Sequence, residues 1–305
     1  MTRMKLWRAL LAMALAVAAL AVAGCGGGDD DDDGGGGGGG GGGDQPAEAQ
    51  QFPADTTMGK IQEKGEITIG VKFDVPPFGF TNPQTDEVEG FDVDMGRILA
   101  EELGVEPRFI EAISDNRIPF LERGTVDVIL STMTINQERD QEIDFSEPYY
   151  VAQGRILVPG DSDIAGLEDL AGNSVCTALG STYEETLRED APDAELRLVD
   201  TYSECLELLQ NGAVDAISTD DVILTGMIIQ DDTLKLVGDE LTTEPYGAGI
   251  KDGDTEFQKF VSDTLEAAQA DGRWEEIYQE WVGQYVDQPQ PPPEMTLEEA
   301  LELGG

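Results

Sequence analysis

The sequence of 305 residues has no histidine, three cysteines, and 18 lysine and arginine residues against 63 aspartate and glutamate residues. Without histidine the chain cannot build a Ser-His-Asp triad, a histidine base or most zinc sites. Phosphate-binding glycine motifs are also missing, since no GxxxxGK[ST] pattern occurs and Gly247-Ala248-Gly249 lacks the rest of a dinucleotide fingerprint. The net charge of −45 argues against nucleic acid or an anionic membrane surface as partners. We therefore predict no cofactor and no metal, and we expect a monomer.

Long hydrophobic runs are almost absent. The one clear run covers residues 9–23 and follows three basic residues, Arg3, Lys5 and Arg8. This layout predicts a secretory signal peptide over residues 1–24. The small residues before Cys25 resemble a lipobox, in which the cysteine is acylated; the alternative is an ordinary thiol. No later stretch reaches the roughly 20 apolar residues of a spanning helix, so we expect an exported protein held at the outer face of the cell membrane by lipid on Cys25.

Low-complexity segments border the central part of the chain. Residues 26–44 contain only glycine and aspartate, a composition that cannot bury apolar surface, and we predict a flexible tether over residues 25–58. A proline-rich run at residues 289–293 belongs to a predicted acidic tail, residues 287–305, in which Thr296-Leu297-Glu298-Glu299 has the pattern of a capping box. The part between them is long enough for one large or two small domains.

The two remaining cysteines are Cys176 and Cys205. An even pair in an exported chain predicts a disulfide, because the compartment outside the cytoplasm is oxidising. Two buried free thiols are the alternative.

Strand and helix patterns alternate along the central part. Buried-strand and amphipathic-helix patterns follow each other twice, at residues 66–71, 92–103, 106–111, 118–123 and 126–130, and then at 174–177, 182–188, 195–199, 202–210 and 213–218. This order predicts an α/β protein of two lobes. Ligand-binding loops then follow the carboxyl ends of the strands, and the site lies in the cleft between the lobes.

Six motifs in order resemble those of family 3 solute-binding proteins, the amino-acid receptors of ABC importers. They are VPPFGF (75–80), EGFDVDMGRILAEELG (89–104), NRIPFLERGTVDV (116–128), the stretches 131–139 and 144–150, LGSTYEETL (179–187) and VDAISTDDV (214–222). The resemblance covers residues 59–286. It implies a type II periplasmic-binding-protein fold with lobe 1 at 59–152 and 247–286 and lobe 2 at 153–246. Two crossing segments would then lie near 151–158 and 242–250, and two helices over 255–283 would return to lobe 1.

The resemblance also implies the groups that hold the ligand. Arg139 would bind the α-carboxylate with help from Thr134, and the backbone N–H of Thr182, at the start of a helix, would add an anion contact. Asp220 would bind the ammonium group. Thr132 would belong to the same site, and Phe78 would form its aromatic floor.

Two further cations indicate the side chain of the ligand. Lys72 and Arg117 occupy positions that, in relatives for glutamate and aspartate, carry cations facing a side-chain carboxylate, so the resemblance predicts an acidic amino acid as ligand. The alternatives are a solvated Lys72 paired with Asp74, and an Arg117 paired with Asp115 or Glu111. A polar neutral ligand such as glutamine is the other possibility. In each case we expect the lobes to close on the ligand and an ABC permease with its ATPase to bind the closed form.

Two other function classes remain as alternatives. The same fold resembles some periplasmic dehydratases and part of certain lytic transglycosylases, and a non-transporting sensor domain would share the binding site. The lack of histidine and of a second catalytic domain favours a protein that is not an enzyme, and the lack of an attached span or kinase argues against the sensor.

Overall fold

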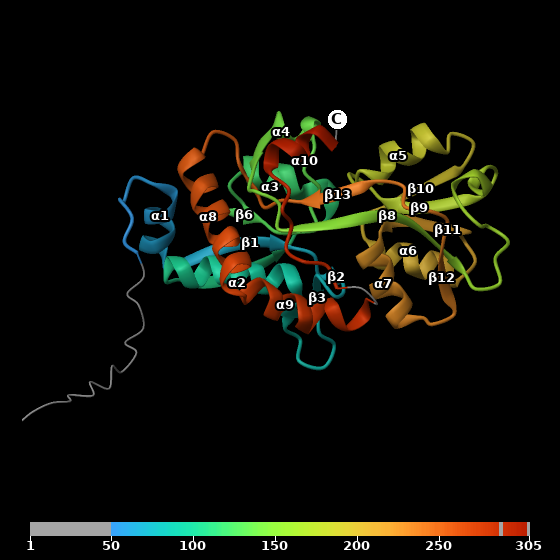
Figure 1. Cartoon of the computed structure of the whole chain (residues 1–305), viewed down its shortest axis with the longest axis horizontal. Helices are drawn as coiled ribbons and strands as arrows, with labels where there is room; N and C mark the ends of the chain where they lie inside the picture. Colours follow the sequence, from blue (N-terminus) through green and yellow to red (C-terminus); the bar gives the residue numbers. More distant parts are fainter. Residues whose placement is uncertain (1–49, 287–288, 304–305) are drawn as a thin grey trace, which may run out of the picture. The chain divides into compact units, whose positions relative to one another are not determined.

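The computed structural model describes residues 50–286 and 289–303 (Figure 1). The predicted signal peptide, Cys25 and most of the predicted tether lie outside the described residues. Helix α1 (Thr57–Lys64) begins within the range predicted as tether, because the Thr56 hydroxyl accepts a 3.0 Å hydrogen bond from the N–H of Gly59 and caps the helix. Within the described ranges, no helix combines the length and apolar character needed to cross a membrane.

The first sheet has the strand order β5-β1-β6-β14-β7. Strand β1 (Glu66–Val71) is buried from Ile67 onward and runs parallel to β5 (Glu106–Glu111) and β6 (Val128–Ile129). Strand β14 (Gly249–Lys251) pairs antiparallel with β6 and with β7 (Ile143–Phe145). A smaller sheet joins β2 (Asp74–Val75), β3 (Gly79–Thr81) and β4 (Val88–Glu89). The first sheet and its helices are called lobe 1 below.

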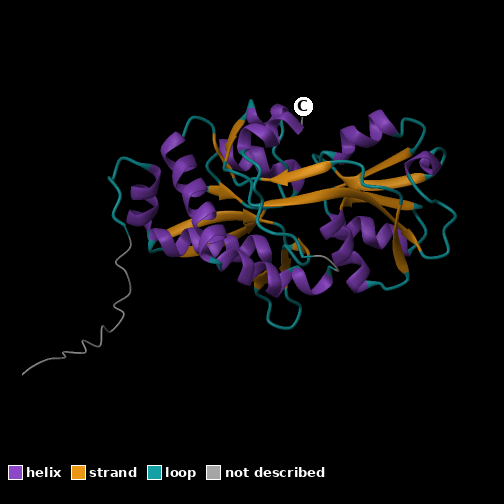
Figure 2. Ribbon diagram, in the orientation of Figure 1, coloured by secondary structure: helices purple, strands orange, loops and turns teal. Residues whose placement is uncertain are grey.

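The helices of lobe 1 come from both ends of the described chain. Besides α1, they are α2 (Phe91–Leu103), η1 (Ser114–Asn116), α3 (Arg117–Glu122), α4 (Gln137–Asp140), α8 (Thr255–Asp271), α9 (Arg273–Trp281) and η3 (Gly283–Tyr285). Helices α8 and α9 both pack on α2 (Figure 2). Trp274 and Tyr278 are one helical turn apart in α9, and both are buried in the core.

The second sheet has the order β10-β9-β11-β8-β12 and, with its helices, forms lobe 2. Its parallel strands are β9 (Ser174–Ala178), β10 (Glu195–Val199) and β11 (Ala216–Asp220), and β12 (Leu234–Val237) pairs antiparallel with β8. The helices are η2 (Leu167–Leu170), α5 (Tyr183–Asp190), α6 (Tyr202–Gln210) and α7 (Asp221–Gln230). A disulfide joins Cys176 of β9 to Cys205 of α6, with the two Cα atoms 5.5 Å apart.

Two antiparallel segments connect the sheets. The first half of β8 (Tyr150–Pro159) pairs with β13 (Thr243–Tyr246), and the second half continues into the sheet of lobe 2. The two strands run side by side in Figure 1. They correspond to the segments near 151–158 and 242–250, which were expected to connect the two lobes. The N–H of Ile135 donates to the carbonyl of Pro245, which fixes β13 to the loop before α4.

The predicted α/β architecture with two sheet-containing lobes is confirmed. The predicted element bounds lie within two residues of those in the structure, and β1, β5, β10 and α6 match at both ends. The exception is β11, expected at 213–218 and found at Ala216–Asp220. The residues just before β11 form a turn instead of a strand. This turn is held by the Asp215 carboxylate, which accepts hydrogen bonds from the N–H (2.8 Å) and hydroxyl (2.6 Å) of Ser174.

The tail packs on lobe 1. Helix α10 (Leu297–Leu303) has the predicted capping box, in which the N–H of Thr296 donates to Glu299 at 2.9 Å and the N–H of Glu299 donates back to the Thr296 hydroxyl at 3.3 Å. Ala300 is fully buried in a cluster with residues of α3 and β7. The segment before α10 is bonded to the first crossing strand, because the Gln290 side chain donates to the Tyr150 hydroxyl at 3.0 Å.

Candidate functional site

A small polar cavity lies where the two lobes meet. Its wall is formed by Ser114, Arg117, Thr132, Thr134 and Arg139 from lobe 1 and by Ser181, Thr182, Tyr183, Tyr202 and Asp220 from lobe 2. Six of the eight ligand residues predicted from the sequence are in this set. The cavity measures about 10 Å³, room for about one water molecule, so a larger ligand fits only if the lobes lie somewhat further apart than they do here.

A second cavity of about 710 Å³ adjoins the first and shares four lining residues with it, Ser114, Arg139, Ser181 and Thr182. Its wall is acidic, with seven carboxylates (Asp115, Glu122, Glu138, Glu142, Glu184, Glu185 and Glu189) and two guanidinium groups (Arg139 and Arg188). It forms the mouth of the cleft. An anion that enters here meets a repulsive field, whereas a zwitterion without net charge does not.

Arg139 lies at the floor of this mouth. It is placed by α4, whose first turn is capped by the Asn136 side chain, which accepts from the N–H of Arg139 at 2.9 Å. Its Nη1 donates to the carbonyl of Thr134 at 2.7 Å and its Nη2 to the carbonyl of Gly180 at 3.1 Å. Burial lowers the pKa of Arg139, and the charge of Glu244 opposes the shift. A guanidinium has five N–H donors, so others remain for a carboxylate.

Arg117 is bonded mainly to the backbone. Its Nε donates to the carbonyl of Ser114 at 3.2 Å, and its Nη1 donates to the carbonyls of Ser131 and Thr132, both at 3.0 Å. Its Nη2 reaches the carbonyl of Gly180 at 3.4 Å. Burial, and then repulsion by Arg139, lowers the pKa of Arg117 to about 9. Most of its N–H donors are bonded to backbone carbonyls, two of which belong to the loop that carries Thr132, and this leaves few donors for a ligand.

Lys72 lies one layer behind the cavity wall. It is 1% exposed, and its ammonium group donates to the Ser114 hydroxyl at 2.7 Å and lies 5.4 Å from the centre of the Tyr202 ring. Burial, and then repulsion by Arg117, lowers the pKa of Lys72 to about 7. The alternative of a solvated lysine is wrong, because the side chain is buried. Lys72 reaches the cavity through Ser114 and Tyr202, which both line it.

Asp220 lines the same cavity as Arg139 but belongs to lobe 2. It ends β11, is 4% exposed and accepts a 2.9 Å hydrogen bond from the Tyr183 hydroxyl. Burial, and then repulsion by Glu244, raises the pKa of Asp220 to about 8. Its neighbour Asp221 accepts instead from the N–H groups of Gln153 and Val222, and so holds the start of α7 to β8.

The three predicted threonines are held by two acidic residues that the sequence prediction missed. The N–H of Thr132, a residue with a φ of 45°, donates to the buried carboxylate of Asp92 at 2.8 Å. The hydroxyls of Thr134 and Thr182 both donate to Glu244 of β13, at 2.6 and 3.0 Å. Asp92 lies within a recognised motif and Glu244 is a lone acid in a crossing segment, but neither pattern shows which threonine it meets.

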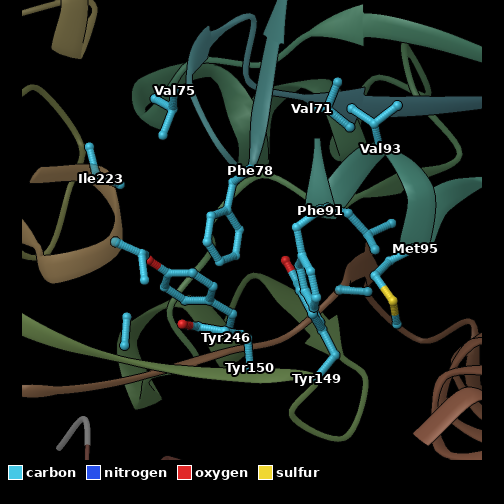
Figure 3. Close-up of a cluster of buried hydrophobic side chains, with 14 of the residues drawn as sticks. Val71, Val75, Phe78, Phe91, Val93, Met95, Tyr149, Tyr150, Ile223 and Tyr246 are labelled. Carbon is cyan, nitrogen blue, oxygen red and sulfur yellow. The ribbon is translucent and has the colours of Figure 1, made fainter. Parts of the chain in front are cut away.

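Phe78 does not line the cavity. Its ring is fully buried and packs against Phe91, Tyr150 and Tyr246, with ring centres 5.1, 4.9 and 5.7 Å apart (Figure 3). The cluster anchors both crossing strands to lobe 1. The aromatic surfaces of the cavity are instead those of Tyr183 and Tyr202, both from lobe 2 and both missed by the sequence prediction.

The sequence of this chain matches the profile of bacterial extracellular solute-binding proteins, family 3, over residues 67–284. It is 38% identical over 239 residues to the ABC transporter glutamine-binding protein GlnH of Bacillus subtilis, which covers 77% of this chain and 88% of that protein. It is 34% identical over 237 residues to the glutamate-binding protein GluB of Corynebacterium efficiens, covering 73% of this chain and 80% of that protein.

The fold agrees with these sequence matches. An ancestral arginine-binding protein bound to glutamine superimposes with a TM-score of 0.69 and 35% sequence identity, covering 72% of this chain and 98% of that one. The matched range 67–284 includes every residue of the cavity wall. The chain therefore belongs to family 3 of the bacterial extracellular solute-binding proteins.

Proposed function

We propose that this protein is the receptor of an ABC importer, that it binds one free amino acid between its lobes, and that this amino acid is glutamine. The observation that carries the proposal is the placement of Arg139 and Asp220 in one cavity wall, on different lobes. A free amino acid has a carboxylate and an ammonium group on one carbon atom. A guanidinium from one lobe and a carboxylate from the other, both lining one cavity, match that pair of charges.

Closure follows from this division of the partners. Arg139, Thr132 and Thr134 belong to lobe 1, and Asp220 and Thr182 belong to lobe 2. An amino acid contacts both sets only when the lobes meet, so it stabilises the closed form relative to the open one. The permease and its ATPase would bind that closed form.

The side chain of the ligand would meet Ser114 and Tyr202. Because the Lys72 ammonium donates to the Ser114 oxygen, the Ser114 hydroxyl keeps its own proton for a carbonyl or carboxylate oxygen. The sequence indicated Arg117 as a second partner of the ligand side chain, but most of its N–H donors are bonded to backbone carbonyls. Together with the acidic mouth, this favours an uncharged amide over a carboxylate.

Glutamate is the second candidate, and Lys72 is the observation that favours it. An ammonium group buried this close to the cavity would be stabilised in its charged form by a side-chain carboxylate. The preference for glutamate or aspartate that the sequence predicted remains a prediction. The similarity to both glutamine-binding and glutamate-binding relatives is compatible with either ligand.

We also propose export, a lipid anchor at Cys25 and a role in binding and not in catalysis. The first two rest on the sequence of residues 1–25. The third rests on the cavity, where Arg117 and Arg139 donate to backbone carbonyls and Asp220 accepts from a hydroxyl. Incubation with glutamine and analysis of the products tests it, because a hydrolase would release glutamate.

A thermal-shift screen over the standard amino acids tests the proposed function. We expect the largest rise in melting temperature with glutamine, a smaller one with glutamate and none with arginine or lysine. A rise with basic amino acids alone would contradict the proposal, and no rise with any amino acid would remove it.

A further inference from the structure

Glu244 is a buried carboxylate on the second crossing strand, outside the ligand set predicted from the sequence. It is 3% exposed and lies in β13, between the two lobes. Its Oε2 accepts from the hydroxyls of Thr134 (2.6 Å) and Thr182 (3.0 Å), and its Oε1 accepts from the hydroxyl of Thr242 (2.6 Å). One carboxylate therefore joins a threonine of lobe 1, a threonine of lobe 2 and the crossing segment itself.

These contacts determine which way two cavity hydroxyls point. A threonine hydroxyl has one proton to donate and lone pairs to accept with, and an ionised carboxylate can only accept. The protons of Thr134 and Thr182 are therefore directed to Glu244, behind the wall. Thr134 and Thr182 line the cavity and Glu244 does not, so with their protons used at Glu244 the two hydroxyls can meet a ligand only as acceptors.

We propose that Glu244 is a positioning residue that turns Thr134 and Thr182 into acceptors for the ammonium group of the ligand, next to Asp220. This inference rests on the proposed binding of a free amino acid. It assigns to Thr134 a contact with the ammonium group, where the sequence had indicated help to the α-carboxylate. Arg139 and the N–H groups at the start of α5 then hold the carboxylate.

The charges around Glu244 agree with this assignment. Its carboxylate attracts the guanidinium of Arg139 and repels the carboxylate of Asp220. A ligand ammonium placed among Thr134, Thr182 and Asp220 would relieve that repulsion between the two acids. The same position would be unfavourable for the α-carboxylate, which belongs beside Arg139.

Two substitutions distinguish a Glu244 that orients the threonine hydroxyls from a Glu244 that only attracts the ligand ammonium by its charge. Glu244→Gln removes the charge but keeps an acceptor oxygen for Thr134 and Thr182, and Glu244→Met removes both. We expect glutamine affinity, measured by calorimetry, to fall less than tenfold in E244Q and about 10- to 100-fold in E244M, as for lost hydrogen bonds with a charged partner. Glu195→Gln, an exposed acid of lobe 2, is the control and should bind as the unmodified protein does.

The threonines provide the second arm. In a protein with Thr134→Val and Thr182→Val, the difference between E244Q and E244M should disappear, because no hydroxyl is left to orient. Equal losses in E244Q and E244M, or a difference that persists without the threonine hydroxyls, would overturn the inference. If E244M does not fold, E244Q alone still tests the inference. Adding E244Q to the double-valine protein should then cause no further loss of glutamine affinity.

The same variants distinguish this inference from the proposed function. If the unmodified protein binds no amino acid, the proposed function fails. The interaction between Glu244 and the two threonines is then measured from melting temperatures without ligand. The loss of stability caused by E244M should be smaller in the double-valine protein than in the unmodified one. Full additivity there would overturn the Glu244–threonine network itself.

Discussion

Arg139 of lobe 1 donates a 3.1 Å hydrogen bond to the carbonyl oxygen of Gly180, which lies in lobe 2 between β9 and α5. The guanidinium proposed to bind the ligand carboxylate is therefore also a direct contact between the lobes. Arg117 reaches the same oxygen at 3.4 Å. The Gly180 carbonyl therefore accepts hydrogen bonds from both Arg117 and Arg139 when the lobes meet. Closure also brings the start of α5 to the ligand.

Gly180→Ala should impede this closure. The residue has a φ of 72°, and an added Cβ would lie 2.7 Å from the Cα of Asp115 across the cleft. Gly212→Ala is the matched control, since it has a φ of 67° and open space around an added Cβ. Both carry the strain of a left-handed alanine, about 1–2 kcal/mol, but only G180A adds a clash between the lobes. We expect G180A to bind glutamine at least tenfold more weakly than G212A.

Small-angle scattering checks the cause of that loss. The unmodified protein and G212A should become more compact on addition of saturating glutamine, and G180A should change less. Equal compaction and equal affinity in the two alanine variants would show that Gly180 is not a closure contact.

Lys72→Met should change the choice between ligands. If Lys72 supports a side-chain carboxylate, its removal should weaken glutamate binding about 10- to 100-fold and glutamine binding less than tenfold. Calorimetry with both ligands measures the two losses. Equal losses would mean that Lys72 only maintains the wall formed by Ser114 and Tyr202.

Arg117→Leu should behave differently from Lys72→Met, although each removes one buried cation. Its loss leaves the carbonyls of Ser131 and Thr132 without a donor, so we expect a lower melting temperature and equal losses for glutamine and glutamate. A loss confined to glutamate would instead support the direct recognition of a side-chain carboxylate by Arg117 that the sequence indicated.

Protons should be exchanged on binding. The pKa of Asp220 is about 8, so near pH 7 this carboxyl is largely protonated, and a ligand ammonium favours its charged form. Glutamine should therefore release protons and bind more tightly as the pH rises from 7 to about 8. Glutamate should release fewer, because its side chain raises the pKa of Lys72 from about 7 and so causes proton uptake there.

Calorimetry in buffers of different ionisation enthalpy counts these protons. Asp220→Asn is the control: it should bind weakly and release none. Identical proton counts for glutamine and glutamate would argue against a role of Lys72 with a side-chain carboxylate.

The tail should contribute stability to lobe 1. Ala300 of α10 is fully buried, so Ala300→Asp would place a charge in an apolar cluster, and the cheapest response is detachment of α10. We therefore expect A300D to lower the melting temperature, but by no more than removal of the whole tail after Val286 does. Thermal unfolding of both, with the exposed Glu298→Gln as control, tests this; unchanged melting in A300D would mean that α10 is not docked.

The fold was predictable because its signals are local. The apolar run of β1 and the glycine after α2 are each visible in a short window of sequence, and they mark a buried strand and a helix end. Strand β11 was misplaced because the apolar pattern at 213–218 does not show that Asp215 is engaged by Ser174. A contact between residues 41 positions apart has no local signal.

The site was predictable only as a set of residues. Motifs placed Arg139 and Asp220 at loops after strands, where ligands bind in α/β proteins. They could not show that Arg117 would be used by carbonyl groups, that Phe78 would lie in an aromatic core, or that Glu244 would approach two threonines from 62 and 110 residues away. Those outcomes depend on how the two lobes meet.

Calorimetric titration of glutamine into the unmodified protein and into Arg139→Ala tests the central claim most directly. Removing one partner of a buried charge pair costs about 3–5 kcal/mol, or about 100-fold or more in affinity. We predict saturable binding of one glutamine per protein molecule and no measurable binding in an R139A protein that still folds. Undiminished affinity in folded R139A would contradict the account, because the amino acid would then bind outside the cavity between the lobes.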